Sequence, residues 1–304
     1  MSIHVTILGF NSAIPTTKSS PTSQFLEIDE RYFLVDCGEG TQVQLRRARA
    51  KFSRINHIFI SHLHGDHCFG LPGLIASFRL LGRDQPLHVY GPKGIKRMLE
   101  TIFSITETHR GFEVVYHELS GDQSQLVYED AKLEVWTIPL DHRIYCNGYL
   151  FKQKPKERKL NMAEISKYPE IEICDYHNLK KGKDFQLSDG FILKNESLTI
   201  APEPPKSYAF CSDTRYKEGV IPIVKGVDVL YHESTFLHEL KEMADYTGHS
   251  TAKEAAEIAQ KAGAKKLVLG HFSNRYEDLT VFTDEARPIF PETYLPIALE
   301  TITV

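Results

Sequence analysis

The stretch Ser61–His67, SHLHGDH, crowds three histidines and one aspartate into seven residues. It follows the apolar run HIFI at 57–60, which predicts a buried strand. A helix is expected to begin near Cys68, so the polar residues are predicted to lie on the loop between the two elements, where functional side chains are often found. A polar turn that happens to be rich in histidine is the alternative, but packing gives no reason to crowd four hydrophilic groups there.

The spacing within this stretch favours metal binding. Residues two apart in an extended segment point the same way, so His62 and His64 can bind one ion. Asp66 and His67 are adjacent, point apart and can serve a second ion. The stretch therefore predicts two metal ions rather than one.

Two ions need further ligands, and three suitable residues follow other predicted strands. His142 comes after LEVWTIPLD, Asp213 after SYAFCS and His271 after KKLVLG. An aspartate between the two clusters can bridge ions about 3.5–4 Å apart. Nitrogen and oxygen donors of this kind fit zinc, with manganese as a possible substitute. A lone histidine at a strand end could also be a surface or capping residue. The prediction that His142, Asp213 and His271 are metal ligands therefore depends on the first motif.

The composition sets outer limits on function. Of the 304 residues, 41% are apolar and 25% are charged, and no apolar run is long enough to cross a bilayer. The net charge of −4 argues against binding nucleic acid over the whole surface, so a polyanion must be held by a local patch. Five separated cysteines without a C-x-x-C pair predict free thiols. The first residues carry no export-signal pattern, and we expect a cytoplasmic protein.

The order of elements predicts an α/β fold. The first 150 residues alternate β-rich runs with helical patterns near 39–50, 68–82 and 93–106, and the alternation resumes after 205. The segment 152–205 differs because it is rich in lysine, has one weak helical pattern at 161–167 and lacks apolar strand runs. We interpret it as a basic insertion within one domain that spans 1–304.

Several motifs together resemble the metallo-β-lactamase superfamily and, more narrowly, its ribonuclease Z family, the tRNA 3′-processing endonucleases, in their short form. HLHGDH is the superfamily signature. The further motifs are VDCGEGTQVQL (35–45), PLDH (139–142), CSDT (211–214), YHESTF (231–236), GHST (248–251) and GHFSNRY (270–276). The resemblance covers about residues 3–300.

The resemblance implies a four-layer αβ/βα sandwich with two Zn²⁺ ions per subunit. In that family's pattern, the first zinc would be held by His62, His64 and His142, the second by Asp66, His67 and His271, and both by Asp213. It also implies a homodimer in which 152–205 is a flexible arm that clamps precursor tRNA. Among the basic residues of that arm, Lys180, Lys181 and Lys183 are the expected contacts to the phosphate backbone.

The same resemblance implies a mechanism and three catalytic residues. A metal-bound hydroxide oriented by Asp66 attacks a phosphodiester, and His249, polarised by Glu233, protonates the leaving 3′-oxygen. The products would be a tRNA with a 3′-hydroxyl and a trailer with a 5′-phosphate. His249 could instead be a neighbour of a helix cap, Glu233 a strand-end residue, and Asp36 either a turn residue or a partner of the metal ligands.

Two departures from the family pattern concern tRNA binding rather than the metals. The arm has YPEIEICDYH (168–177) where the family carries a Gly-Pro pair, and Ser19 and Ser20 replace the Arg-Asn pair that ends the loop after the first strand. A small-molecule phosphodiesterase or another hydrolase of the superfamily is the alternative function. An RNA-binding module with structural metals is a further one, although structural zinc sites are usually closed and cysteine-rich.

Overall fold

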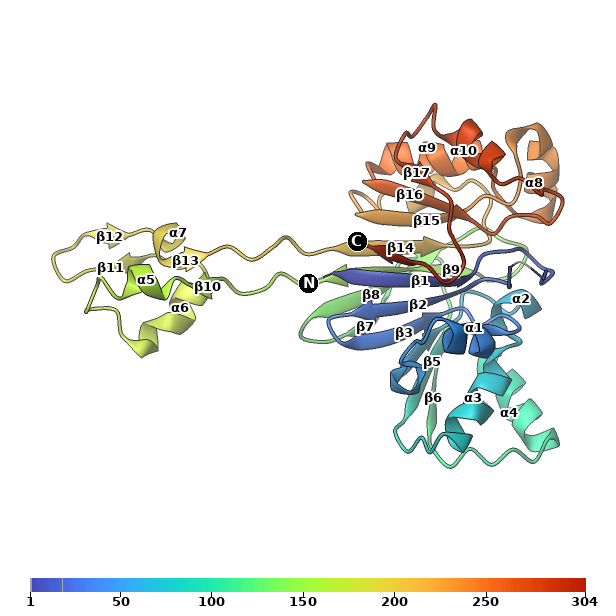
Figure 1. The fold of residues 1–304 in the computed structure, drawn as a ribbon, viewed down its shortest axis with the longest axis horizontal. Helices are drawn as coiled ribbons and strands as arrows, with labels where there is room; N and C mark the ends of the chain where they lie inside the picture. Colours follow the sequence, from blue (N-terminus) through green and yellow to red (C-terminus); the bar gives the residue numbers. More distant parts are fainter. Residues whose placement is uncertain (1, 18) are drawn as a thin grey trace. The chain divides into compact units, whose positions relative to one another are not determined.

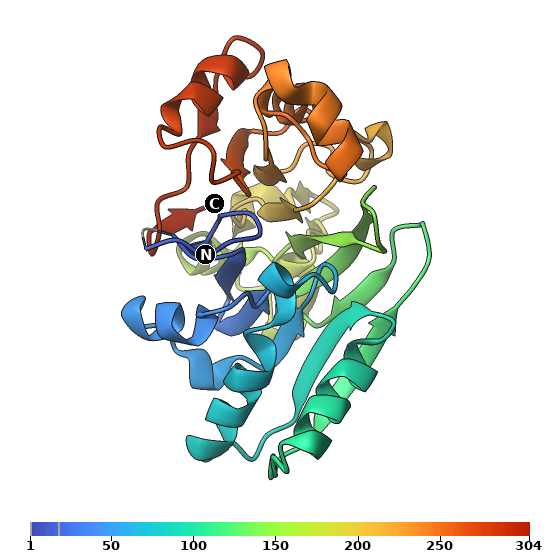
Figure 2. The same ribbon diagram turned by 90° about the vertical axis from the view of Figure 1, so that its right-hand side faces the viewer.

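The computed structural model describes residues 2–17 and 19–304. Two seven-stranded mixed sheets form its largest part (Figures 1 and 2). The first sheet has the order β18 (Thr301–Thr303), β1 (Ile3–Gly9), β2 (Ser23–Ile28), β3 (Arg31–Val35), β4 (His57–Phe59), β5 (Leu87–Pro92) and β6 (Val114–Leu119). The second has the order β17 (Thr293–Tyr294), β16 (Lys266–Gly270), β15 (Val229–Glu233), β14 (Ser207–Cys211), β9 (Asn147–Gln153), β8 (Leu133–Pro139) and β7 (Leu126–Glu129).

Aromatic side chains join the inner faces of the two sheets. Phe33 of β3 lies 5.6 Å from Phe151 of β9, and Phe59 of β4 lies 5.1 Å from Tyr149, measured between ring centroids. All four rings are buried. Buried aromatic pairs at such distances contribute beyond their apolar area, so they hold the sheets face to face.

Helices cover the outer faces of both sheets. On the first sheet these are α1 (Thr41–Arg47), α3 (Leu71–Leu80) and α4 (Ile95–Ile105), and on the second α9 (Ala252–Ala262) and α10 (Thr280–Ala286) (Figures 1 and 2). The short helices α2 (Gly65–Cys68) and α8 (Lys241–Thr247) lie beyond the ends of the strands (Figure 1). In α3, Leu71, Leu74, Ile75 and Phe78 are buried against the first sheet because they recur at helical spacing. Helix, sheet, sheet and helix make the four layers that the sequence predicted, and the fold prediction is confirmed.

Parallel strands bring chemistry to one edge of each sheet. Strands β3 to β6 are mutually parallel, as are β14 to β17. Parallel strands end at the same edge of a sheet. The residues that follow β4 therefore lie at one edge of the first sheet, and those that follow β14, β15 and β16 lie at one edge of the second. The candidate site lies beyond these carboxyl ends.

A separate compact unit consists of Gln153–Pro205 with Asp130–Leu133. It contains β10 (Lys159–Leu160), α5 (Met162–Ile165), α6 (Tyr176–Lys180), β11 (Phe185–Gln186), β12 (Ile192–Leu193), α7 (Asn195–Leu198) and β13 (Thr199–Ile200). Its own small core consists of Ile165, Ile171, Leu179, Leu193 and Leu198. The expectation of a single weak helix is therefore wrong for this segment, because dispersed apolar residues form a small core through several short elements.

The prediction that all four residues of the HLHGDH motif lie on a loop is also wrong in part. His64 is extended and precedes α2, whereas Asp66 and His67 lie inside that one-turn helix. Gly65 opens the helix with the Phe69 ring lying close against it, where a Cβ would come within 2.5 Å of the ring. A larger residue at position 65 would push the exposed Phe69 ring away from this backbone.

Among the helices of the described residues, none has both the length and the apolar character that crossing a bilayer requires.

Candidate metal centre

The backbone is strained where it turns into the candidate site. Asp36, directly after β3, has φ 56°, and His271, directly after β16, has φ 59°. Residues other than glycine rarely adopt such left-handed angles, and they cluster at functional sites when the surrounding structure enforces them. Both side chains are buried, so the strain aims polar groups inward.

The predicted ligands lie in two groups. In the first, His64 Nδ1 lies 2.9 Å from His62 Nε2 and 3.2 Å from His142 Nε2. In the second, Asp66 Oδ2 lies 3.4 Å from His67 Nε2 and 3.6 Å from His271 Nε2. The structure thus brings together residues from separate segments of the chain.

Asp213 lies between the two groups with one oxygen toward each. Its Oδ2 atom lies 3.6 Å from His62 Nε2 and 3.8 Å from His142 Nε2. Its Oδ1 atom lies 3.2 Å from Nε2 of both His67 and His271. A carboxylate shared in this way is the arrangement that a bridging ligand needs.

Hydrogen bonds fix the tautomers of His62 and His67. Asp36 Oδ2 accepts a hydrogen bond from His67 Nδ1 at 2.7 Å. Ser61 Oγ donates its hydrogen to the same carboxylate at 2.8 Å and therefore accepts from His62 Nδ1 at 3.0 Å. With Nδ1 carrying the hydrogen, the Nε2 atom of each neutral ring presents a lone pair to the centre.

His142 and His271 are oriented in the same way. His142 Nδ1 donates to the carbonyl oxygen of Gly248 at 2.7 Å. Thr235 Oγ1 donates to Glu233 Oε2 at 2.7 Å and so accepts from His271 Nδ1 at 3.0 Å. Both Nε2 atoms therefore also present lone pairs toward the Asp213 carboxylate.

These residues fit a metal ion. The Nε2 atoms of His67 and His271 are buried and have no hydrogen-bond partner within the described part of the chain. Lone pairs of several rings converging on a carboxylate repel one another unless a cation lies between them. Imidazole and carboxylate are donors that zinc accepts. This histidine–aspartate cluster therefore has the donor set of a metal-binding protein.

The charge balance supports the same conclusion. Burial alone would lower the pKa of His67, but the carboxylates of Asp213, Asp36 and Asp66 outweigh it and raise that pKa well above its ordinary value. Three carboxylates around one buried ring create a strongly negative potential. Without a metal this potential favours a proton on Nε2 of His67, and a metal cation that displaces the proton would use the Nε2 lone pair instead.

His249 and Glu233 form a pair beside the metal ligands. His249 Nδ1 donates to Glu233 Oε1 at 2.8 Å, and Thr214 N donates to the same oxygen at 2.9 Å. Burial alone would lower the pKa of His249, but the charge and hydrogen bond of Glu233 raise it. The His249 ring also stacks on the His271 ring, with 5.2 Å between their centroids. Potential ligand atoms of His249, Asp213 and His271 lie within 4.8 Å of one another, so these three residues are close enough to share a metal ion.

The three predicted substrate-binding lysines lie elsewhere in the chain. Lys180 ends α6, and Lys181 and Lys183 occupy the turn that follows it. All three are exposed and belong to the separate unit, not to the part that carries the metal centre.

Sequence reasoning missed several residues that orient the predicted ones. Thr235 links Glu233 to His271, and Gly248 orients His142 through its carbonyl group. The Ala13 amide donates to Asp66 Oδ2 at 2.9 Å and fixes that carboxylate. Thr235 and Gly248 carried a signal, because they belong to the HEST and GHST motifs together with the predicted Glu233 and His249, whereas Ala13 lies in no such motif.

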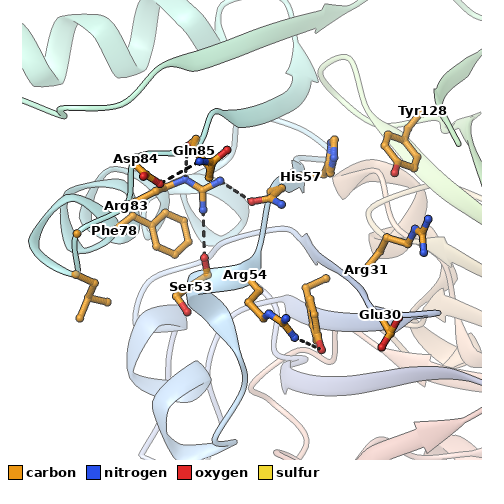
Figure 3. A pocket seen from close by; sticks show the side chains of 14 residues that line it. Glu30, Arg31, Ser53, Arg54, His57, Phe78, Arg83, Asp84, Gln85 and Tyr128 are labelled. Carbon is orange, nitrogen blue, oxygen red and sulfur yellow. Dashed lines mark hydrogen bonds between the residues drawn. The ribbon is translucent and has the colours of Figure 1, made fainter.

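A cavity of about 570 Å³ lies apart from this chemistry. Its lining includes Arg31 and His57 at the amino ends of β3 and β4, the opposite ends of the strands that lead into the metal centre (Figure 3). Arg54 lies over the Tyr32 ring, and Arg83 donates to backbone carbonyls around it, including Ile55 O at 2.8 Å. None of the candidate ligands lines this cavity.

Comparison with known families places this fold and centre in a recognised class. Residues 181–272 match the model of the beta-lactamase superfamily domain, and residues 3–119 match that of the anti-Pycsar protein Apyc1. Two sheets between helices, with a histidine–aspartate centre at their strand ends, define a protein of the metallo-β-lactamase fold class.

Relatives over nearly the full length narrow the class. The chain is 47% identical to ribonuclease Z of Porphyromonas gingivalis over 96% of its own length and 95% of that protein. It is 46% identical to ribonuclease Z of Bacteroides thetaiotaomicron, with 98% and 94% coverage. The crystal structure of human tRNase Z, short form, superposes with a TM-score of 0.71 at 27% identity, covering 98% of both chains. The chain belongs to the ribonuclease Z family, as the motifs indicated.

Proposed function

We propose that the chain is a metal-dependent endoribonuclease that removes the 3′ trailer from precursor tRNA. Membership of the ribonuclease Z family makes it a hydrolase of phosphodiester bonds in RNA. The observation that carries the proposal is the centre itself, in which Asp213 turns one oxygen toward each of two histidine groups. The products would be a tRNA with a 3′-hydroxyl and a trailer with a 5′-phosphate.

Two zinc ions per subunit fit the two groups. His62, His64 and His142 would hold one ion, Asp66, His67 and His271 the other, and Asp213 both. When bound, the ions supply a water that can attack at neutral pH and positive charge that stabilises the phosphoryl oxygens. The protein supplies rings whose tautomers are set before the metal arrives.

Asp66, His249 and Glu233 would handle the protons. Asp66 Oδ2 is held by the Ala13 amide, which orients this carboxylate to accept the proton of the attacking water. His249 donates Nδ1–H to Glu233, so its Nε2 atom is the one that can protonate the leaving 3′-oxygen. Glu233 favours the protonated ring and keeps it in place because its other oxygen is fixed by Thr235.

The separate unit and the assembly complete the proposal. Exposed Lys180, Lys181 and Lys183 would contact the phosphate backbone of the tRNA. Such contacts are electrostatic and do not depend on the nucleotide sequence, so they suit a protein that binds many tRNAs. Family membership supports a homodimer in which this unit serves as the tRNA-binding arm, and a cytoplasmic site of action where precursor tRNA is processed.

The decisive experiment is cleavage-site mapping on a defined precursor tRNA with zinc-loaded protein. We expect one cut at the start of the trailer, with a 3′-hydroxyl on the tRNA. His249→Ala should lower kcat by about 10²- to 10⁴-fold, the range for a lost general acid. His109→Ala removes an exposed histidine and is the matched control.

Two outcomes would contradict parts of the proposal. An intact precursor under conditions where a known ribonuclease Z cuts it, together with rapid hydrolysis of small phosphodiesters, would favour a small-molecule phosphodiesterase. If circular dichroism shows that Asp66→Ala is unfolded, rather than folded but inactive, the metal has a structural role.

A further inference from the structure

Phe69 is an exposed aromatic ring beside the metal centre. It follows α2 directly, three residues after Asp66, and 68% of its surface is accessible to solvent. A large apolar side chain costs free energy in water, and this one directly follows the helical turn that carries Asp66 and His67. It takes no part in the buried core, which instead receives Leu71 and Leu74 of the next helix.

The ring packs against the backbone of the helical turn that precedes it. The Phe69 amide donates to the Gly65 carbonyl at 2.9 Å. A Cβ placed on Gly65 would come within 2.5 to 3.0 Å of three atoms of the ring, so the ring lies against that backbone. One face of the ring is therefore covered by the segment that carries Asp66, and the accessible surface belongs to the rest of the ring.

We propose that Phe69 is a stacking platform for a nucleobase next to the scissile phosphodiester. The inference rests on the proposed action on RNA and names one residue that positions that substrate. Bases stack on aromatic side chains whatever their identity, since every base has a π-face. A platform fixed to the segment that carries Asp66 would place the neighbouring phosphate at the metal centre without reading sequence.

The test combines protein variants with modified RNA. Phe69→Ala should lower kcat/KM on a precursor tRNA by about 5- to 150-fold, the range for the removal of one base stack. Phe69→Trp and Phe69→Tyr keep a π-face and should restore most of this activity. Leu80→Ala removes an even more exposed apolar side chain at the far end of α3 and should leave cleavage unchanged.

An abasic nucleotide separates stacking from any other effect. Precursors that lack the base on the 5′ or on the 3′ side of the scissile bond are cut by wild type and by Phe69→Ala. At one of the two positions, loss of the base should lower kcat/KM of the wild type by the same factor as Phe69→Ala lowers it on intact RNA. Loss of that base should not lower kcat/KM of Phe69→Ala any further. Equal losses of both proteins at both positions would overturn the inference, as would full activity of Phe69→Ala on intact RNA.

Folding and the proposed function are checked separately. Zinc content and thermal unfolding of Phe69→Ala should match the wild type, because the side chain is exposed. If wild type fails to cut precursor tRNA at all, the proposed function fails and this inference with it. If wild type cuts but shows no coupling to either base, the inference alone fails.

Discussion

Side chains and backbone groups outside the predicted ligand set decide how the predicted ligands point. Asp36, Ser61, Gly248 and Thr235 each take an Nδ1 hydrogen from one of four histidines. Partners of this kind set ring orientation and typically change metal affinity by about 10- to 100-fold when they are removed. The centre is therefore preorganised by hydrogen bonds to the ligands as much as by the ligands themselves.

Thr235 offers the cleanest test of this preorganisation. Thr235→Val keeps the volume but removes the hydroxyl that joins His271 to Glu233, so we expect zinc affinity to fall about 10- to 100-fold. Competition with a chromophoric chelator measures it. Thr235→Ser retains the hydroxyl and should bind zinc like the wild type. Equal affinity of Thr235→Val and wild type would contradict the argument.

At this scale the sequence predicts the ligands better than their partners. Histidines and aspartates that follow apolar strands are visible in a single chain because they break the strand pattern. Gly248 acts through its carbonyl group on His142, 106 residues away, and Ala13 acts through its amide on Asp66. Every residue has the same backbone carbonyl group and almost every residue the same amide, so these contacts cannot be predicted from the residue type.

Among the elements, α9 places the GHST motif. Thr251 caps this helix: its hydroxyl accepts from Glu254 N, and Glu254 Oε2 accepts from Thr251 N at 3.0 Å. His249 and Ser250 directly precede the cap. The helix start therefore fixes the chain that carries the proposed general acid. This Thr-x-x-Glu capping box lies within four consecutive residues, so it depends on local sequence alone.

Removing the cap should cost stability. Thr251→Ala leaves the Glu254 amide without its acceptor, and we expect the free energy of unfolding to fall by about 1 kcal/mol. Urea denaturation followed by circular dichroism measures the change. Thr251→Ser keeps the acceptor and serves as the control. A decrease in the serine variant as large as in the alanine variant would point to packing of the methyl group instead.

Asp228 ties the amino ends of β14 and β16 to β15. Its Oδ2 atom accepts from Ser207 N at 2.8 Å, and its Oδ1 atom accepts from Lys265 Nζ at 2.7 Å. Burial alone would raise the pKa of Asp228, but these bonds outweigh it and lower that pKa below its ordinary value. The ionised form is thus the one that the fold stabilises.

The lowered pKa fixes how stability should depend on pH. The contribution of Asp228 is present above the unfolded pKa of about 3.9 and is lost as pH falls through the folded pKa. Asp228→Asn should therefore be less stable than the wild type from about pH 5 to 8, with the difference shrinking below about pH 4. Urea unfolding at each pH tests this. Asp84→Asn, at an exposed position, should show no such trend.

For the whole molecule, the least predictable part is the separate unit. Its core residues are spread between lysines and turns over Ile165 to Leu198, without the periodicity that reveals strands or helices. Elements of two to five residues leave too short a pattern to read from sequence. Lysine content correctly marked a segment that differs from its surroundings, but it carried no information about a core.

That unit also tests how tRNA is held. Replacing Lys180, Lys181 and Lys183 with glutamine should raise KM for precursor tRNA and lower the slope of log KM against log salt by about 1 for each phosphate that is no longer bound. Because these side chains are exposed and outside the metal-bearing part, kcat should stay within about twofold. Steady-state kinetics at several salt concentrations gives both quantities.

The control removes the same charge from elsewhere on the chain. Glutamine at Lys93, Lys96 and Lys225, which are exposed outside this unit, changes the net charge equally. If net charge alone steers the RNA, both triple variants will show the same KM and the same salt slope, and the proposed role of the arm lysines is wrong. If the unit holds the phosphate backbone, only its own variant weakens binding, because phosphate contacts act within about a Debye length of the charge.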